Sequence, residues 1–87
     1  MPIIKIHYFA SVRERLNQSE EQLTLPEGVT SIEDLIKHLQ IINPSFKSVM
    51  DSSKKILVAV NQTVIVDLNY KLSDDDEVAF FPPMTGG

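Results

Sequence analysis

A capped amphipathic helix pattern in the middle of the chain constrains the fold more than any other feature. Ser31 is followed three residues on by Asp34, which is the capping-box sequence of a helix N-terminus; Thr30 with Glu33 is an alternative pair of the same kind. Apolar residues then recur at helical spacing and form one stripe: Ile32, Leu35, Ile36, Leu39 and Ile42. The pattern predicts one helix that packs along this stripe.

The sequence also predicts where this helix ends. Asn43 precedes Pro44, and a residue before proline is pushed out of the helical region of backbone space. The helix therefore has about 11 residues, near the mean length. Its solvent side is expected to carry Lys37, His38 and Gln40.

The segments on both sides of the helix favour strands. Residues 3–9, 56–60, 63–66 and 77–81 are rich in β-branched and aromatic residues, and residues 20–25 are interpreted as a further strand with Leu23 and Leu25 inward. Alternation turns these side chains toward the core: Ile4, Ile6, Tyr8, Leu23, Leu25, Val78 and Phe80. Residues 10–17 suggest a helical turn or two, and residues 45–55 an irregular segment with one packed turn at Phe46, Val49 and Met50.

The order of these elements predicts the fold class. One main helix that covers one face of a mixed sheet is an α+β two-layer sandwich. Two strands, a crossing helix and later strands that return beside the first resemble the ubiquitin-like β-grasp. We expect a β-grasp domain over residues 1–81 and an extended C-terminal Gly-Gly tail over residues 82–87.

Size and composition exclude several classes of function. At 87 residues and 9.8 kDa the chain is one small domain, with little interior left for a private active-site cavity. The absence of cysteine excludes disulfides, thiolate metal sites and cysteine nucleophiles. A net charge of −4 argues against nucleic acid and anionic membrane surfaces as partners. We expect a cytoplasmic protein, because no signal sequence and no apolar run of about 18 residues is present.

Candidate internal sites are weak. His7 and His38 lie on different elements without a second ligand at metal-binding spacing, so both are expected to be solvated, and no metal site is predicted. The acidic run 74–77 lacks the ligand spacing and the glycine of a calcium loop and is expected to be a hairpin turn. Asn61 and Gln62 are expected to turn the chain between two strands.

The C-terminal segment is different. Two of the three glycines are Gly86 and Gly87, and Pro82-Pro83 precedes them. The prolines fix two φ angles and remove two backbone donors, which makes a stiff stem after Phe81. Met84 and Thr85 offer side chains to a partner, and the six residues span about 20 Å when extended, enough to enter a channel in another protein. Glycines without a Cβ let a narrow site approach the terminal carboxylate of Gly87, which must be activated before it can react.

Three blocks of the sequence resemble one family. The ending D-E-V-A-F-F-P-P-M-T-G-G at 76–87 closely resembles the C-terminus of the small subunit of molybdopterin synthase. The turn V-N-Q at 60–62 and the block Y-F-A-S-V-R-E at 8–14 resemble two further blocks of the same family. The likeness runs essentially the whole chain, and the ending is its most specific part.

The resemblance implies a sulfur carrier that is not an enzyme on its own. Gly87, with Gly86 before it, would be adenylated by a ubiquitin-activating-like enzyme that consumes ATP, and a sulfur-donating enzyme would supply the thiocarboxylate. No cofactor would be bound stably. The tail Pro82, Pro83, Met84 and Thr85 would insert into the large synthase subunit, in a complex of two small and two large subunits. There sulfur would pass to cyclic pyranopterin monophosphate to build the dithiolene of molybdopterin.

A docking surface is predicted beside the tail. Alternation places Phe9 and Phe81 on the face opposite the helix, with Val64 beside them, and an exposed aromatic patch is typical of an interface. Three other functions stay open at this point. The chain could carry sulfur for thiamine, cysteine or transfer-RNA thiolation, modify proteins as ubiquitin does, or act as a passive interaction module.

Overall fold

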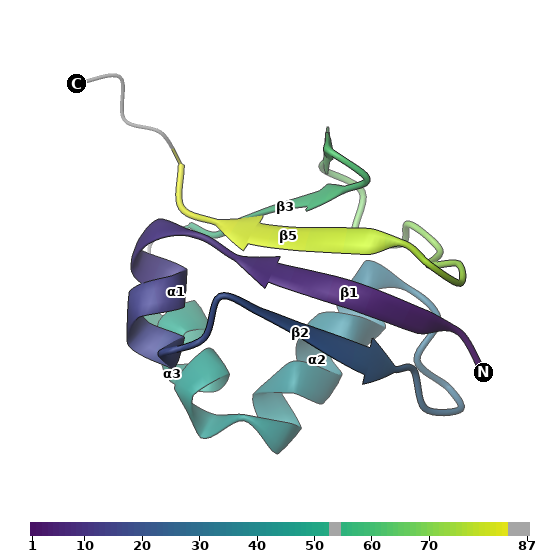
Figure 1. The fold of residues 1–87 in the computed structure, drawn as a ribbon, viewed down its shortest axis with the longest axis horizontal. Helices are drawn as coiled ribbons and strands as arrows, with labels where there is room; N and C mark the ends of the chain where they lie inside the picture. Colours follow the sequence, from purple (N-terminus) through teal and green to yellow (C-terminus); the bar gives the residue numbers. More distant parts are fainter. Residues whose placement is uncertain (53–54, 84–87) are drawn as a thin grey trace.

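The computed structural model describes residues 1–52 and 55–83 of the chain. Five strands and three helices follow one another in this part (Figure 1). In chain order they are β1 (Ile3–Tyr8), α1 (Ala10–Leu16), β2 (Glu20–Thr24), α2 (Ile32–Ile42), α3 (Pro44–Ser52), β3 (Leu57–Val60), β4 (Thr63–Ile65) and β5 (Glu77–Phe81). All five predicted strands are present, within one or two residues of the predicted limits.

The strands form one mixed sheet in the order β2-β1-β5-β3-β4. β5 pairs parallel with β1, with Tyr8 opposite Phe80, and antiparallel with β3, with Val58 opposite the same residue. The remaining pairs, β1 with β2 and β3 with β4, are antiparallel. The helices pack against one face of this sheet, which confirms the predicted α+β β-grasp arrangement (Figure 1).

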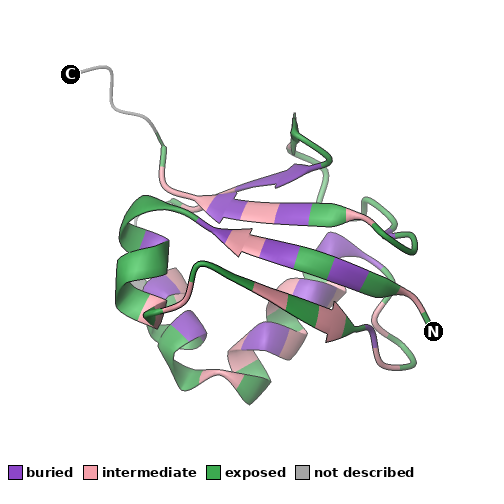
Figure 2. Cartoon of the chain, in the orientation of Figure 1, coloured by how far each residue is buried: buried purple, intermediate pink, exposed green. Residues whose placement is uncertain are grey.

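The core lies between the sheet and the helices, where the alternation predicted it. β1 buries Ile4, Ile6 and Tyr8, and β5 buries Val78 and Phe80 (Figure 2). Three rings meet at the centre: Phe46 lies edge-on to Phe80 at 5.2 Å between centroids, and Tyr8 stacks on Phe80 at 6.2 Å. Such geometries add about 0.5–1.5 kcal/mol per pair to the area that the rings bury.

The Tyr8 hydroxyl is satisfied at the edge of this core. It donates a hydrogen bond of 2.5 Å to Oε1 of Glu21 on β2. Burial raises the pKa of the Tyr8 phenol far above its usual range, and the hydrogen bond and negative charge of Glu21 raise it further. The phenol therefore stays a neutral donor in the folded domain.

The capping box of α2 is formed as the sequence predicts. The Ser31 hydroxyl accepts a bond from the Asp34 amide at 3.2 Å, and the Asp34 carboxylate accepts the Ser31 amide at 3.3 Å. The Thr30 amide also donates to this carboxylate, at 3.2 Å. These bonds, led by the one from Thr30, lower the pKa of Asp34.

One expectation about the segment after α2 is wrong. Residues 44–52 form the helix α3 where an irregular segment with one packed turn was predicted, and α2 is still the longest of the three helices. Pro44 ends α2 and also begins α3, because proline is favoured at the first position of a helix. The Asn43 side chain accepts the amides of Ser45 and Phe46, at 3.0 and 3.3 Å, and so satisfies the new helix start.

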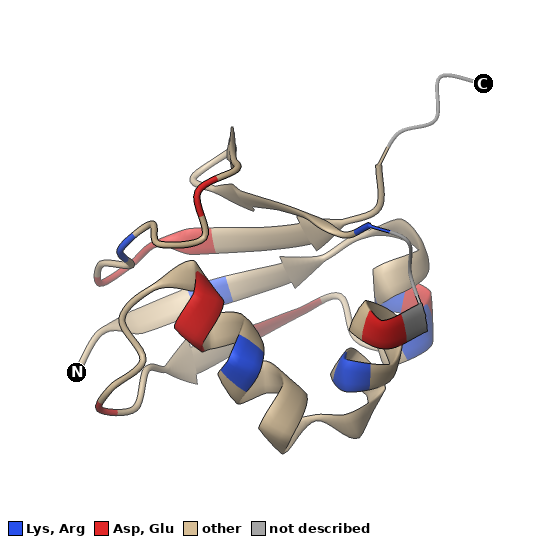
Figure 3. Ribbon diagram, turned by 180° about the vertical axis from the view of Figure 1, so that it is seen from behind, with Lys and Arg blue, Asp and Glu red and all other residues tan. Residues whose placement is uncertain are grey.

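The apolar stripe of α2 is shorter than predicted. Ile42 is 51% exposed, because the chain leaves the helix at Asn43 in an extended conformation and α3 turns back. His38 and Gln40, placed on the solvent side by the pattern, are half-buried. Lys37 is exposed and pairs with Glu33 at 3.6 Å. Charges of both signs are present on the helical layer (Figure 3).

The turns that flank β5 hold it through polar side chains. Asn61 and Gln62 join β3 to β4 with φ values of 50° and 70°, the two left-handed positions of a type I′ hairpin. Asn61 Oδ1 accepts the Glu77 amide at 3.0 Å, and its Nδ2 donates to Asp76 at 3.0 Å. The acidic run turns the chain at Asp74 and Asp75, and Glu77 already begins β5. The turn is not the expected hairpin, because β4 and β5 are not neighbours in the sheet. Asp74 accepts the Ile3 amide at 2.8 Å. In the described part of the chain, no helix is both long and apolar enough to cross a bilayer.

Candidate functional site

The helices leave one face of the sheet open, and strand register fixes which residues share it. His7 lies opposite Ala79, Ala79 opposite Ala59, and Ala59 opposite Val64, which makes one row across four strands. The next row toward the tail begins with Phe9 and Phe81, because Phe81 follows Ala79 by two residues on β5. The open face is therefore apolar at the end from which the tail leaves.

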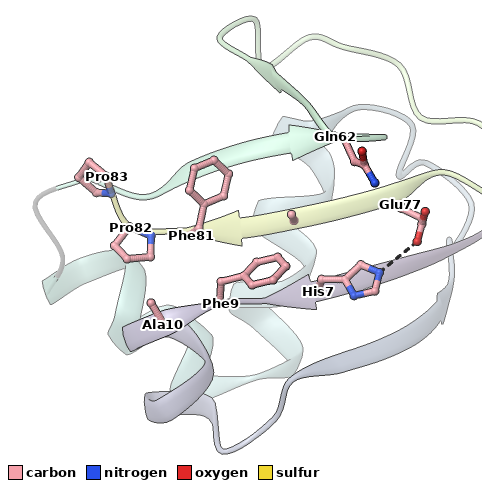
Figure 4. Close-up of a pocket in the computed structure, with 9 residues that line it drawn as sticks. His7, Phe9, Ala10, Gln62, Glu77, Phe81, Pro82 and Pro83 are labelled. Atoms are coloured by element: carbon pink, nitrogen blue, oxygen red, sulfur yellow. Dashed lines mark hydrogen bonds and ion pairs between the residues drawn. The ribbon is translucent and has the colours of Figure 1, made fainter. Parts of the chain in front are cut away.

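A groove of about 570 Å³ lies over this apolar end. Phe9 and Phe81 both line it (Figure 4), and Ala79, two residues before Phe81 on β5, lies opposite His7 in the sheet. Phe9 is 48% exposed, an unusual state for a large aromatic side chain. The groove is lined by nine residues: His7, Phe9, Ala10, Gln62, Glu77, Ala79, Phe81, Pro82 and Pro83.

The sharp entry into α1 shapes the groove near the tail. Ala10 has a φ of 51°, in the left-handed region that costs a residue with a Cβ roughly 1 kcal/mol. This conformation turns the chain from β1 into α1 within one residue. The Phe9 amide still donates to the Phe80 carbonyl at 3.1 Å, which keeps Phe9 beside β5.

The opposite end of the groove is polar. Nε2 of His7 lies 3.3 Å from Oε1 of Glu77 (Figure 4). On the other side of the ring, Nδ1 of His7 lies 3.7 Å from Oε2 of Glu20. The two carboxylates stand on the neighbouring strands β5 and β2, on opposite sides of the ring. In residues 1–52 and 55–83 no group of three or more His, Cys, Asp or Glu side chains is arranged to hold a metal ion.

The stem of the tail starts at this groove. Pro82 is half-buried and Pro83 exposed, and both contribute to its wall. The predicted site residues Met84, Thr85, Gly86 and Gly87 lie outside the described residues. From Pro83 four residues span at most about 13 Å when extended.

The predicted docking residues are only partly brought together. Phe9 and Phe81 line the same groove, as expected. Val64 is on the same face and exposed, but it lies on the edge strand β4 and is not part of the groove wall. The sequence pattern missed Ala10, whose left-handed backbone carries no sequence signal, and His7, which the alternation from Phe9 could have placed here.

Comparison with known proteins gives concordant results. The model of the ThiS family matches residues 6–87. The molybdopterin synthase sulfur carrier subunit of Escherichia coli is 36% identical over 85 residues, which are 98% of this chain and 100% of that protein.

Solved structures show the same fold. SAMP1 from Haloferax volcanii aligns with a TM-score of 0.78 at 23% identity, over 98% of this chain and 99% of that one. A protein–protein complex of subunits 1 and 2 of the molybdopterin-converting factor from Helicobacter pylori contains a chain with a TM-score of 0.68 at 19% identity, over 98% of this chain and 99% of that one. With a family model that covers nearly all its residues and a relative of 36% identity over its full length, the chain belongs to the ThiS family, among the sulfur carrier subunits of molybdopterin synthase.

Proposed function

We propose that this chain is the sulfur carrier subunit of a molybdopterin synthase, and that its C-terminal Gly87 carries the sulfur. The observation that carries the proposal is the position of the groove. Phe9 and Phe81 form an apolar surface where the Pro82-Pro83 stem leaves the sheet. A partner that covers this surface receives the tail in a fixed direction, which aligns the terminal atom for reaction. The relative from Escherichia coli is a molybdopterin synthase sulfur carrier subunit, and this chain matches it over that protein's whole length.

The chemistry starts from an unreactive carboxylate. An activating enzyme transfers the adenylyl group of ATP to the Gly87 carboxylate and releases pyrophosphate. A sulfur-donating enzyme then supplies sulfur at the oxidation level of sulfide, which attacks the acyl carbon of Gly87, displaces AMP and leaves a thiocarboxylate. ATP is thus a substrate of the activating enzyme and not a cofactor of this chain, and we place the step in the cytoplasm.

The final transfer takes place on a partner. The tail from Pro82 to Gly87 enters the large synthase subunit, and the thiocarboxylate sulfur passes to cyclic pyranopterin monophosphate to build the dithiolene. Attack by that sulfur joins Gly87 to the substrate through a thioester, and hydrolysis of the thioester leaves the sulfur on the substrate and returns the carboxylate. Each carrier delivers one sulfur, so one dithiolene takes two carriers. The named complex from Helicobacter pylori supports a large subunit as the partner, and we propose two small and two large subunits in the complex. The active site belongs to the large subunit, and this chain donates the sulfur.

Intact-mass spectrometry tests the proposal directly. The chain is incubated with ATP, an activating enzyme and a sulfur source, and its mass is recorded. We expect a gain that corresponds to the replacement of one oxygen by sulfur, and no gain in a variant that lacks Gly87. An unchanged mass of the full chain would contradict sulfur carriage.

The rival functions give different products in related assays. A ubiquitin-like modifier would appear as isopeptide adducts on lysines of other proteins. A carrier for another thiolation pathway would gain sulfur but fail to make molybdopterin with the large subunit. A passive interaction module would keep its function without residues 82–87.

A further inference from the structure

We propose that His7 is a positioning residue for docking, and that its ring holds the exposed Phe9 side chain in the orientation that the partner meets. The inference rests on the proposed function, because Phe9 acts here as part of the surface that the large synthase subunit covers. It goes further by giving a role to the polar end of the groove, which the sulfur chemistry does not use. His7 acts through Phe9 and not through a contact of its own with the partner.

The backbone of Phe9 is fixed, so only its side chain is left to be ordered. Phe9 follows β1 directly in an extended conformation, with φ −121° and ψ 154°. Its amide donates to the Phe80 carbonyl at 3.1 Å, and its carbonyl accepts the amides of Val12 and Arg13 at 3.1 and 3.3 Å. The ring itself is 48% exposed. An exposed ring that can change rotamer loses this freedom when a partner binds, and the loss weakens binding.

The ring of His7 lies against the ring of Phe9. The two residues are two positions apart, and the extended backbone at Phe9 continues the alternation of β1, so their side chains share one face of the sheet. Their ring centroids are 6.4 Å apart and their planes meet at 26°. Figure 4 shows the Phe9 ring turned toward His7. Stacked rings attract each other at centroid distances of about 4.5–7 Å, so the His7 ring favours this orientation of Phe9.

His7 can support Phe9 because its own ring is held from both sides. Nε2 of His7 is within hydrogen-bond distance of Oε1 of Glu77 on β5, at 3.3 Å. Glu20 on β2 is the register partner of His7, and its Oε2 lies 3.7 Å from Nδ1 of the ring. The His7 side chain is 29% exposed, less than either carboxylate. The ring is thus restrained in the free domain and passes this restraint to Phe9.

A partner therefore meets Phe9 already in its docking orientation. Ordering one mobile aromatic side chain on binding lowers the affinity by roughly threefold to tenfold. We expect loss of the His7 ring to have this effect, and loss of Phe9 itself to lower the affinity by about thirtyfold, as truncation of an aromatic anchor does. Because His7 acts through Phe9, the two effects should not multiply.

A double-mutant cycle on binding to the large subunit tests the proposal. Binding titrations compare the native chain, His7→Ala, Phe9→Ala and the double variant. His7→Ala should weaken binding in the native chain but have no further effect in the Phe9→Ala chain. Lys5→Ala is the matched control, because Lys5 is exposed on the same face of β1, two residues before His7, and its effect should be equal in both backgrounds. An effect of His7→Ala that is also equal in both backgrounds overturns the proposal.

Two further substitutions separate the ring of His7 from its polar atoms. His7→Phe keeps a ring beside Phe9 and should restore most of the binding. His7→Gln keeps a hydrogen-bond partner for Glu77 without a ring, and it should bind as weakly as His7→Ala. The opposite order, with binding restored by glutamine and not by phenylalanine, would mean that His7 contacts the partner directly and would refute the positioning role.

NMR of the free chain measures the orientation of Phe9 without a partner. Three-bond couplings from Cγ of Phe9 to the backbone nitrogen and carbonyl carbon report its χ1 rotamer. We expect one rotamer in the native chain and in His7→Phe, and averaged couplings in His7→Ala and His7→Gln, all measured below the melting temperature of each variant. Averaged couplings in the native chain, or unchanged couplings in His7→Ala, overturn the inference. A native chain that does not bind the large subunit contradicts the proposed function instead, and the couplings then still decide whether His7 positions Phe9.

Discussion

Phe80 and Phe81 are neighbours on β5, yet their rings lie on opposite faces of the sheet. Phe80 is buried, and its ring meets the Phe46 ring edge-on with 5.2 Å between the centroids. Phe81 is half-buried and lines the groove beside the tail. One residue therefore holds the helical layer and the next faces the proposed partner. Adjacent positions thus separate stability from docking.

Truncation of each ring should show this separation. Phe80→Ala is expected to lower the free energy of unfolding by about 3–5 kcal/mol, because it leaves a cavity among buried rings. Phe81→Ala should cost the fold less but weaken binding to the large subunit by more than about 2 kcal/mol, as loss of a central aromatic anchor does. A thermal melt and a binding titration for each variant measure both effects. If Phe81→Ala melts as early as Phe80→Ala and binds normally when folded, the assignment of faces is reversed.

The position of the terminal atom should matter to within one residue. Deletion of Gly87, or addition of one residue after it, is expected to abolish molybdopterin synthesis, because the reacting atom loses its alignment in the partner. The melting temperature should not change, since terminal residues contribute little to stability. One residue added before Met1 is the control for the length change. Full synthesis by the extended variant, with its extra residue still attached, would refute the terminal-carboxylate mechanism.

The capping carboxylate of α2 should make stability depend on acid pH. The pKa of Asp34 is lowered in the folded state, chiefly by the hydrogen bond from the Thr30 amide. The carboxylate therefore stabilises the fold at pH values above the pKa that Asp34 has in the unfolded chain. This contribution is lost as the pH falls through the folded value. Asp34→Asn should therefore melt below the native chain at pH 7, and the gap should narrow in acid, below about pH 4. Glu14→Gln on α1 controls for the removal of one carboxylate, and a gap that is constant with pH would contradict the assignment.

The buried phenol should resist ionisation. In a Tyr70→Phe variant, Tyr8 is the remaining tyrosine. Because its pKa is raised, we expect no tyrosinate absorbance at about pH 10 while the domain is folded. The raised pKa of Tyr8 contributes stability that is fully present at pH values below the pKa of an unfolded tyrosine. This contribution is lost as the pH rises from that value toward the pKa in the folded state. Alkaline unfolding and the appearance of tyrosinate should thus coincide. Tyrosinate that forms well before the loss of circular dichroism would show that Tyr8 is accessible.

The hairpin between β3 and β4 should respond differently at its two positions. Asn61→Ala removes the side-chain bonds to Asp76 and Glu77 and is expected to cost about 1–3 kcal/mol. Gln62→Gly relieves a residue at φ 70° and should be neutral or stabilising by up to about 1 kcal/mol. Urea denaturation measures both variants. Equal losses would show that the turn is not of the left-handed type.

Local patterns predicted most of the elements. The cap at Ser31 and Asp34 and the alternation along β1 and β5 depend on neighbouring residues, so the sequence alone was sufficient to place them. Pro44 misled the prediction because the same residue can end one helix and begin another, and the choice depends on the Asn43 cap and on burial of Phe46.

For the candidate site, alternation predicts the face that Phe9 and Phe81 share, but it does not predict that the two side chains line one groove. Phe9 and Phe81 are 72 residues apart, and they meet because β1 and β5 pair in parallel. The place of His7 at the polar end of the groove depends on the carboxylates of two other strands, Glu20 and Glu77. The exposure of Val64 follows from the strand order, which periodicity does not specify.

The last strand of the domain to be synthesised lies in the middle of the sheet. Until β5 has left the ribosome, β1 with β2 and β3 with β4 have no strand to join them, and the core cannot close. The sheet therefore cannot be completed before β5 is free to pair with both halves. A nascent chain cut short before this point stays unfolded and is open to proteases. A folded copy of the domain therefore contains the chain at least as far as Phe81, where the tail begins.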